Sequence, residues 1–109
     1  MSKDDVNAHR LELDPILTIR TITEIHEQVM SALNEVQHLE ISVPEVGEVD
    51  LSFLQLIEAA RITAEMEGKQ ISLVRPASQQ LRDLLERGGF LTDMDPNSRT
   101  FWLHERQNQ

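Results

Sequence analysis

The sequence predicts a single α/β domain built on a mixed β-sheet. Short apolar runs that are typical of strands take turns along the chain with longer segments in which apolar residues recur every three or four positions, as on one side of a helix. Such alternation places helices as crossovers between strands of one sheet. The length of 109 residues suits one domain. We assign residues 9–104 to it and expect a flexible N-terminus at 1–8 and a polar tail at 105–109.

The first half of the chain is expected to contain three strands and one helix. The strands cover residues 9–13, 16–17 and 38–43, and apolar and polar residues alternate in the first and the third. The helix begins after Thr21 and carries one apolar stripe. Thr21 is a suitable N-cap, and Glu24 three positions later completes the pattern of a capping box.

The second half is expected to contain a short apolar run, two more strands and two more helices. The apolar run 49–51 leads into a helix that Ser52 opens as its N-cap. A strand follows at 70–74, and Ser78 caps the next helix, which a pair of glycines ends. Residues 100–103 form the expected last strand. Four residues are expected in the core: Leu54, Ile57, Leu73 and Leu84.

Composition excludes several classes of partner and compartment. A formal net charge of −9 opposes binding to nucleic acid and to anionic lipid. No apolar run approaches the ~20 residues that span a bilayer, so direct membrane insertion is not expected. The first residues lack the apolar core of a signal peptide. The expected compartment is the cytoplasm.

No catalytic, metal or cofactor site stands out in the sequence. The chain has no cysteine, which removes thiolate ligands and a cysteine nucleophile. Its four histidines lack the spacing of metal ligands, and no nucleophile, base and orienting acid form a recognisable triad. The run at 93–97 opens like a calcium loop, but Ser98 stands where the glycine belongs and His104 where the bidentate glutamate belongs. We therefore expect a protein that is not an enzyme.

Three stretches carry a family resemblance: V-D-L-S-F-L-Q-L-I-E-A-A from Val49, G-K-Q-I-S-L-V from Gly68 and S-Q-Q-L-R-D-L-L-E-R-G-G-F from Ser78. Together they resemble a STAS domain, the fold of the bacterial anti-sigma factor antagonists, over about residues 11–103. The resemblance implies a STAS-type mixed β-sheet with helices packed mainly on one face. The wording D-L-S-F-L-Q-L is similar to STAS proteins associated with chemotaxis or two-component systems.

The resemblance also implies roles for residues at the start of the second helix. The family run Asp-Ser-Ser-Gly-Leu matches Asp50, Ser52 and Leu54, whereas its first Ser is Leu51 here and its Gly is Phe53. In regulatory members the second Ser is phosphorylated by a kinase of the histidine-kinase-like ATPase fold, and a phosphatase reverses the modification. The resemblance thus implies that Ser52 is a phosphoacceptor and that Asp50, Leu51 and Phe53 bind a protein partner. That partner would be the kinase, an anti-sigma-like factor or a chemotaxis or two-component protein.

The position of Ser52 suits such a switch on physical grounds. Unpaired N–H groups and the positive end of the helix dipole can hold a phosphate at a helix N-terminus. The phosphate adds a charge of about −1.5 to −2 at neutral pH. With Glu48 and Asp50 close by, the modified form would be rejected by an acidic or apolar partner surface.

Three other readings stay open from the sequence. Ser52 can be an ordinary helix cap, and Leu51 and Phe53 can be core residues. The chain can be a constitutive subunit, because some standalone STAS domains brace the ATPase of a membrane transporter without phosphorylation. Nucleotide binding has also been proposed within the family, but no nucleotide motif is present here.

Overall fold

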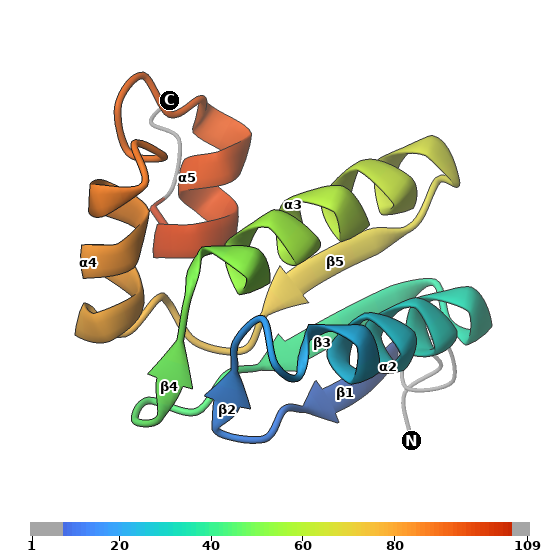
Figure 1. The fold of residues 1–109 in the computed structure, drawn as a ribbon. Coiled ribbons are helices and arrows are strands. Elements are labelled where there is room, and N and C mark those ends of the chain that lie inside the picture. Colours follow the sequence, from blue (N-terminus) through green and yellow to red (C-terminus); the bar gives the residue numbers. More distant parts are fainter. Residues whose placement is uncertain (1–7, 106–109) are drawn as a thin grey trace.

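The computed structural model describes residues 8–105, which form a parallel α/β structure (Figure 1). The predicted segments at 1–8 and 105–109 therefore lie largely outside the described residues. The elements follow in the order β1 (Ala8–Glu12), β2 (Ile16–Leu17), α2 (Ile22–Glu35), β3 (His38–Ser42), β4 (Glu48–Val49), α3 (Leu51–Met66), β5 (Gln70–Leu73), α4 (Gln79–Arg87) and α5 (Pro96–Leu103).

The sheet has the strand order β1-β3-β5, and both pairings are parallel. Parallel neighbours require crossovers, which α2 and α3 provide. The α/β class is confirmed, but every pairing among the described residues is parallel, where the prediction was for a mixed sheet. The two crossover helices contact each other and the sheet. Helices α4 and α5 lie near the C-terminal end of β5, which the arrowhead marks (Figure 1).

The core lies between these two helices and the sheet. In β3 the side chains of Leu39 and Ile41 are buried, whereas their neighbours along the strand are only half-buried. This alternation turns the apolar face of the strand toward the helices. The four predicted core residues, Leu54, Ile57, Leu73 and Leu84, are all buried, which confirms their prediction.

Strands β2 and β4 form a second parallel pair. They follow β1 and β3 along the chain, and the register of pairing changes between the two pairs. Ala8 faces His38, but Ile16 faces Glu48, so the loop before β4 holds two more residues than the segment opposite. Gly47 in this loop has φ +145°, and a Cβ there would collide with the carbonyl oxygen of Pro15. Glycine is therefore required at this position.

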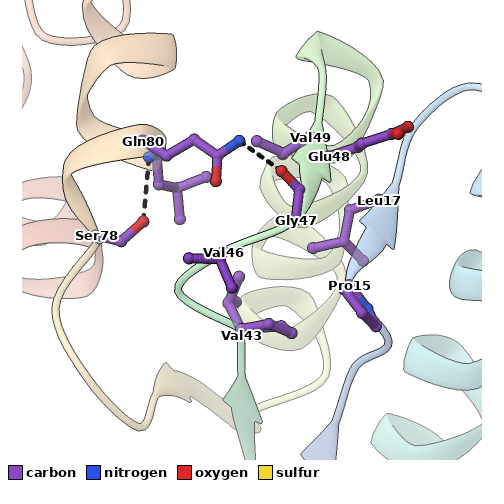
Figure 2. Close-up of a pocket in the computed structure, with 11 residues that line it drawn as sticks. Pro15, Leu17, Val43, Val46, Gly47, Glu48, Val49, Ser78 and Gln80 are labelled. Atoms are coloured by element: carbon purple, nitrogen blue, oxygen red, sulfur yellow. Dashed lines mark hydrogen bonds between the residues drawn. The ribbon is translucent and has the colours of Figure 1, made fainter.

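The loop before β4 is also fastened to α4. Gln80 donates from Nε2 to the carbonyl oxygen of Gly47 at 2.8 Å, and Figure 2 shows the small hollow between the two segments. The hollow has a volume of about 10 Å³, which is space for about one water molecule. It is a packing defect beside the start of α4 and too small for a metabolite.

Of the predicted serine and threonine caps at α4 and α2, the structure has the first and not the second. Ser78 caps α4 as predicted and accepts from the backbone N–H of Leu81 at 3.2 Å. Thr21 precedes α2, but its hydroxyl donates to the carbonyl oxygen of Ile16 at 2.9 Å, so the predicted capping box does not form. At the other end of α2, Lys69 donates from Nζ to the carbonyl oxygen of Leu33 at 2.7 Å, which satisfies a free carbonyl and complements the helix dipole.

The predicted last strand at 100–103 is wrong, because this segment belongs to α5. Asp95 caps the helix by accepting from the N–H of Ser98 at 2.7 Å, and Pro96 occupies the first turn. Proline is favoured there since the N–H that it lacks would have no partner in the helix. Three consecutive apolar residues of α5 are buried: Phe101, Trp102 and Leu103.

Candidate functional site

The predicted site lies at the start of α3, directly after β4. Asp50, not Ser52, is the N-cap: its backbone is extended, at φ −134° and ψ −177°, and its Oδ1 accepts from the backbone N–H of Ser52 at 3.0 Å. The prediction that Ser52 caps the helix is therefore wrong. Asp50 keeps an extended backbone because it continues β4, donating its own N–H to the carbonyl oxygen of Leu17 at 3.2 Å. Ser52 becomes the second residue of the helix, in its first turn.

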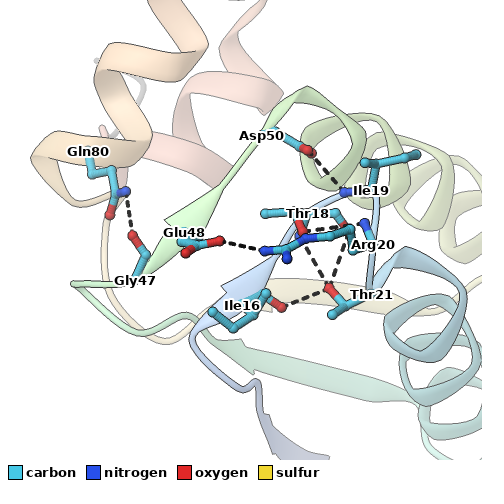
Figure 3. Close-up of polar contacts among 9 residues, drawn as sticks. All are labelled: Ile16, Thr18, Ile19, Arg20, Thr21, Gly47, Glu48, Asp50 and Gln80. Atoms are coloured by element: carbon cyan, nitrogen blue, oxygen red, sulfur yellow. Dashed lines mark hydrogen bonds and ion pairs between the residues drawn. The ribbon is translucent and has the colours of Figure 1, made fainter.

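The Ser52 hydroxyl is half-buried and points back to the cap. It donates to Oδ1 of Asp50 at 2.5 Å, the same oxygen that accepts from the Ser52 backbone. The other carboxylate oxygen, Oδ2, accepts from the backbone N–H of Ile19 at 3.0 Å (Figure 3). One carboxylate thus connects the hydroxyl of α3 with a turn that lies 31 residues earlier in the chain.

The turn that carries Ile19 is held by further contacts of its own. The N–H of Thr21 donates to the carbonyl oxygen of Thr18 at 2.8 Å, and the Thr21 hydroxyl accepts from the N–H of Thr18 at 3.2 Å. Arg20 pairs with Glu48 of β4 at 3.0 Å, as Figure 3 shows. Both partners of this ion pair are well exposed, so its contribution to stability is small.

The donors around Asp50 favour its charged form. Loss of water around the carboxylate would by itself raise its pKa, but hydrogen bonds from the Ser52 hydroxyl and from the N–H groups of Ile19 and Ser52 together outweigh this effect. The pKa of Asp50 is therefore lowered. At neutral pH the Ser52 hydroxyl lies against a full negative charge.

Apolar side chains flank this polar pair unequally. Leu51 is 42% exposed and Ile19 is 66% exposed, whereas Phe53 is completely buried in the core. Burial removes Phe53 from the predicted partner-binding surface, because a side chain without exposed area cannot contact a partner. We refer to Ile19, Asp50, Leu51 and Ser52 as the Ser52 surface. Ile19 was missed in the sequence, since only the pairing of β2 with β4 brings it to Asp50.

The end of α4 supports the Ser52 surface from one side. A Cβ on Gly88 would come within 2.8 Å of Cδ2 of Leu51, so the absence of a side chain at Gly88 lets Leu51 lie close to the end of α4. Phe90, two residues later, is partly buried against the core. Leu51 is thus half in contact with the domain and half free to meet a partner.

Two histidines make contacts that the sequence did not predict, and His104 places its Nε2 3.1 Å from the carbonyl oxygen of Leu73. Nε2 of His38 lies 2.9 Å from Oγ of Ser72 on the neighbouring strand. Within residues 8–105 the structure gives His38 no carboxylate hydrogen-bond partner, so the two residues do not form a catalytic triad. In the same part of the chain, no three His, Asp or Glu side chains gather as ligands for a metal ion. None of the described helices has the length and apolar character needed to cross a membrane.

Comparison with protein families decides the class of the chain. The family model described as "Mlab, STAS domain" matches residues 2–94. The chain belongs to the STAS domain family. Such domains are in general binding modules without enzymatic activity that serve signalling or regulation. No curated protein and no solved structure gives a significant match. Helix α5 lies outside the matched residues.

Proposed function

We propose that this STAS domain is a cytoplasmic regulatory module that binds a protein partner through the Ser52 surface and is switched by reversible phosphorylation of Ser52. One observation carries the proposal. The partly buried Ser52, in the first turn of a helix, shares the Asp50 carboxylate with the N–H of Ile19, and the side chains of Ile19 and of the adjacent Leu51 are exposed. The resemblance to anti-sigma factor antagonists supports the choice of a kinase, an anti-sigma-like factor or a chemotaxis or two-component protein as the partner.

The switch follows from what a phosphate does to this surface. In the unmodified form, Leu51 and Ile19 offer apolar area that a partner can cover. A phosphate on Ser52 adds a charge of about −1.5 to −2 to this surface, beside the ionised Asp50. Docking would then require the partner to desolvate that charge, which costs free energy unless a cation pairs with it. A partner with an apolar or acidic socket releases the modified form.

Binding measurements on variants of Ser52 test this proposal. The partners to use are purified kinases and anti-sigma-like proteins encoded by neighbouring genes, with affinities determined by calorimetry and folding checked by thermal melts. Ser52→Ala and Ser52→Asn should bind like the parent, because neither adds charge. Ser52→Asp should bind at least about tenfold more weakly, equivalent to about 1.4 kcal/mol. Ser52→Asn is the matched control, since it has nearly the shape of Asp without its charge.

The position of the cap changes the expected stabilities of these variants. Asp50 caps the helix, so Ser52→Ala loses only the hydroxyl bond to the carboxylate and should cost about 1 kcal/mol. If the Asp variant binds as tightly as the Asn variant and no candidate kinase phosphorylates Ser52, the proposed switch is wrong.

A constitutive subunit is the second candidate, and one contact favours it. The Ser52 hydroxyl already has a structural partner in Asp50, which is reason enough for a serine at this position. In this case the domain would brace a membrane transporter ATPase in a permanent complex. Leu51→Ser should then weaken the complex with that ATPase, while Ser52→Asp should weaken it no more than Ser52→Asn.

A further inference from the structure

Asp50 joins two segments that the sequence keeps far apart. Strands β2 and β4 pair in parallel, so the residues that follow them, at 18–21 and from Asp50 on, leave the pair side by side. The carboxylate of Asp50 bridges this gap, with Oδ1 bound to Ser52 and Oδ2 bound to the N–H of Ile19. A change at one oxygen of a carboxylate necessarily affects the position of the other.

The turn at 18–21 depends on Asp50 at one point. Thr18 and Thr21 bind each other, and the Arg20 side chain reaches Glu48 of β4. The N–H of Ile19 is bound from outside the turn by Asp50 Oδ2 (Figure 3). Since the Ile19 side chain is mostly exposed, little packing fixes it in place. The hydrogen bond to Asp50 therefore positions this half of the apolar surface.

Phosphorylation would remove one support of Asp50 and add a repulsion. The Ser52 oxygen forms a bond to the γ-phosphorus of ATP, the bond from that phosphorus to ADP breaks, and the hydroxyl proton leaves to a base of the kinase. Asp50 Oδ1 then loses its hydroxyl donor and faces a phosphate that carries about two negative charges. Like charges at hydrogen-bond distance repel strongly in a partly desolvated site. Rotation of the Asp50 carboxylate away from Ser52 relieves the repulsion and takes Oδ2 away from Ile19.

We propose that Asp50 is a positioning residue that transmits the state of Ser52 to the turn at 18–21, so that phosphorylation releases Ile19 from the docking surface. The inference rests on the proposed function, because it describes how modification of the same site is regulated and read. Under this inference, phosphorylation changes the conformation of the turn at 18–21 as well as the charge at Ser52. The partner would then face a phosphate on Ser52, and the Ile19 side chain would no longer be held in position for it to contact.

Amide hydrogen exchange on the intact chain tests the inference without any partner. Protein with phosphoserine incorporated at position 52 is compared with unmodified protein by heteronuclear NMR, and exchange of the Ile19 N–H is followed residue by residue. Release should accelerate this exchange by at least about tenfold, whereas a buried helix amide such as that of Val29 should change by less than about twofold. If the exchange rate of the Ile19 N–H is the same in the phosphorylated and unmodified proteins, the inference is wrong.

Asp50→Ser provides the control for the route of transmission. Serine is a good N-cap and keeps α3 started, but its short side chain cannot reach Ile19. The Ile19 amide should therefore exchange rapidly in this variant without phosphate, and phosphorylation should accelerate it no further. A full additional acceleration by phosphate in Asp50→Ser would show that Asp50 is not the connection.

The two proposals fail in different measurements. The exchange experiment reads only the turn at 18–21, and the calorimetry on Ser52 variants reads only partner binding. Fast exchange of Ile19 in the phosphorylated protein supports the transmission even if that form still binds its partner, in which case the proposed switch is wrong. Slow exchange together with lost binding supports the switch and overturns the transmission.

Discussion

At the scale of single residues, Asp50 has the most consequential environment in the described chain. Its carboxylate accepts from Ile19, from the Ser52 backbone and from the Ser52 hydroxyl, and its pKa is lowered. A carboxyl group with a lower pKa in the folded state than in the unfolded state stabilises the fold above its unfolded pKa. This stabilisation is lost as the pH falls through the folded pKa.

The free energy of unfolding should therefore depend on pH through Asp50, and the Asp50→Asn variant should lack this dependence. At pH 7 we expect the variant to be less stable than the parent by about 1 kcal/mol, because an amide cannot accept from both Ile19 and Ser52. As the pH falls toward 3, below the ordinary Asp pKa of about 3.9, this carboxyl takes up its proton in the unfolded parent before it does so in the folded parent, where its pKa is lowered, so the difference should shrink. Urea unfolding at the two pH values measures both differences. A gap that stays constant or widens in acid would contradict the lowered pKa.

The sequence could indicate this site but could not assign its parts. Asp50 and Ser52 are both residue types that cap helices, and two positions separate them. The choice depends on where the backbone changes from extended to helical, which the pairing of β4 with β2 decides. The same pairing brings Ile19 to the site. A long-range contact of this kind leaves no local pattern that could predict it.

At the scale of elements, α5 follows the residues that the family model matches, and side-chain contacts join it to α3. Arg61 of α3 donates to Glu58 at 3.0 Å and to Ser98 of α5 at 3.1 Å, and it lies 4.6 Å from the ring centroid of Phe101. Trp102 donates from its indole N–H to the same Glu58 carboxylate at 2.8 Å. This polar network fixes α5 to α3, and Trp102 is completely buried below it.

The only tryptophan of the chain makes the docking of α5 directly measurable. Arg61→Met removes the bonds to Glu58 and Ser98 and the contact with Phe101, which should cost about 1–3 kcal/mol. Because Trp102 is part of the core, its fluorescence and the far-UV circular dichroism should still change at the same urea concentration. Arg99→Met on the exposed side of α5 is the control and should cost at most about 0.5 kcal/mol. If fluorescence changes first in the parent, α5 detaches separately and the core assignment is wrong.

The elements differ in how far the sequence could predict them. α2, α3 and α4 show clear helical spacing of apolar residues, and their existence was predicted. The run Phe101-Trp102-Leu103 is too short to distinguish strand from helix. The signal that could have decided it is Asp95-Pro96, an N-cap followed by proline in the first turn.

At the scale of the whole molecule, connectivity and charge decide different properties. Alternation of strands and helices predicted the α/β class, and the two crossovers that it implies make the pairings parallel. The last segment, which was expected to be a strand, forms α5 instead. The net charge of −9 does not affect this topology. It affects the free energy of the compact state, in which like charges are held close together.

Self-repulsion of this size makes stability sensitive to salt. The screening length falls from ~30 Å at 0.01 M to ~3 Å at 1 M, so salt should raise the melting temperature. A rise of about 4–8 °C would correspond to about 1 kcal/mol in a domain of this size. The control replaces three exposed acids on different helices: Glu27→Lys, Glu65→Lys and Glu86→Lys. Each replacement changes the charge by two, so this variant carries −3 in place of −9 and should melt higher than the parent at low salt, with a smaller further rise on adding salt. Equal salt dependence in both proteins would show that salt acts through general exclusion from the surface rather than through screening of the net charge.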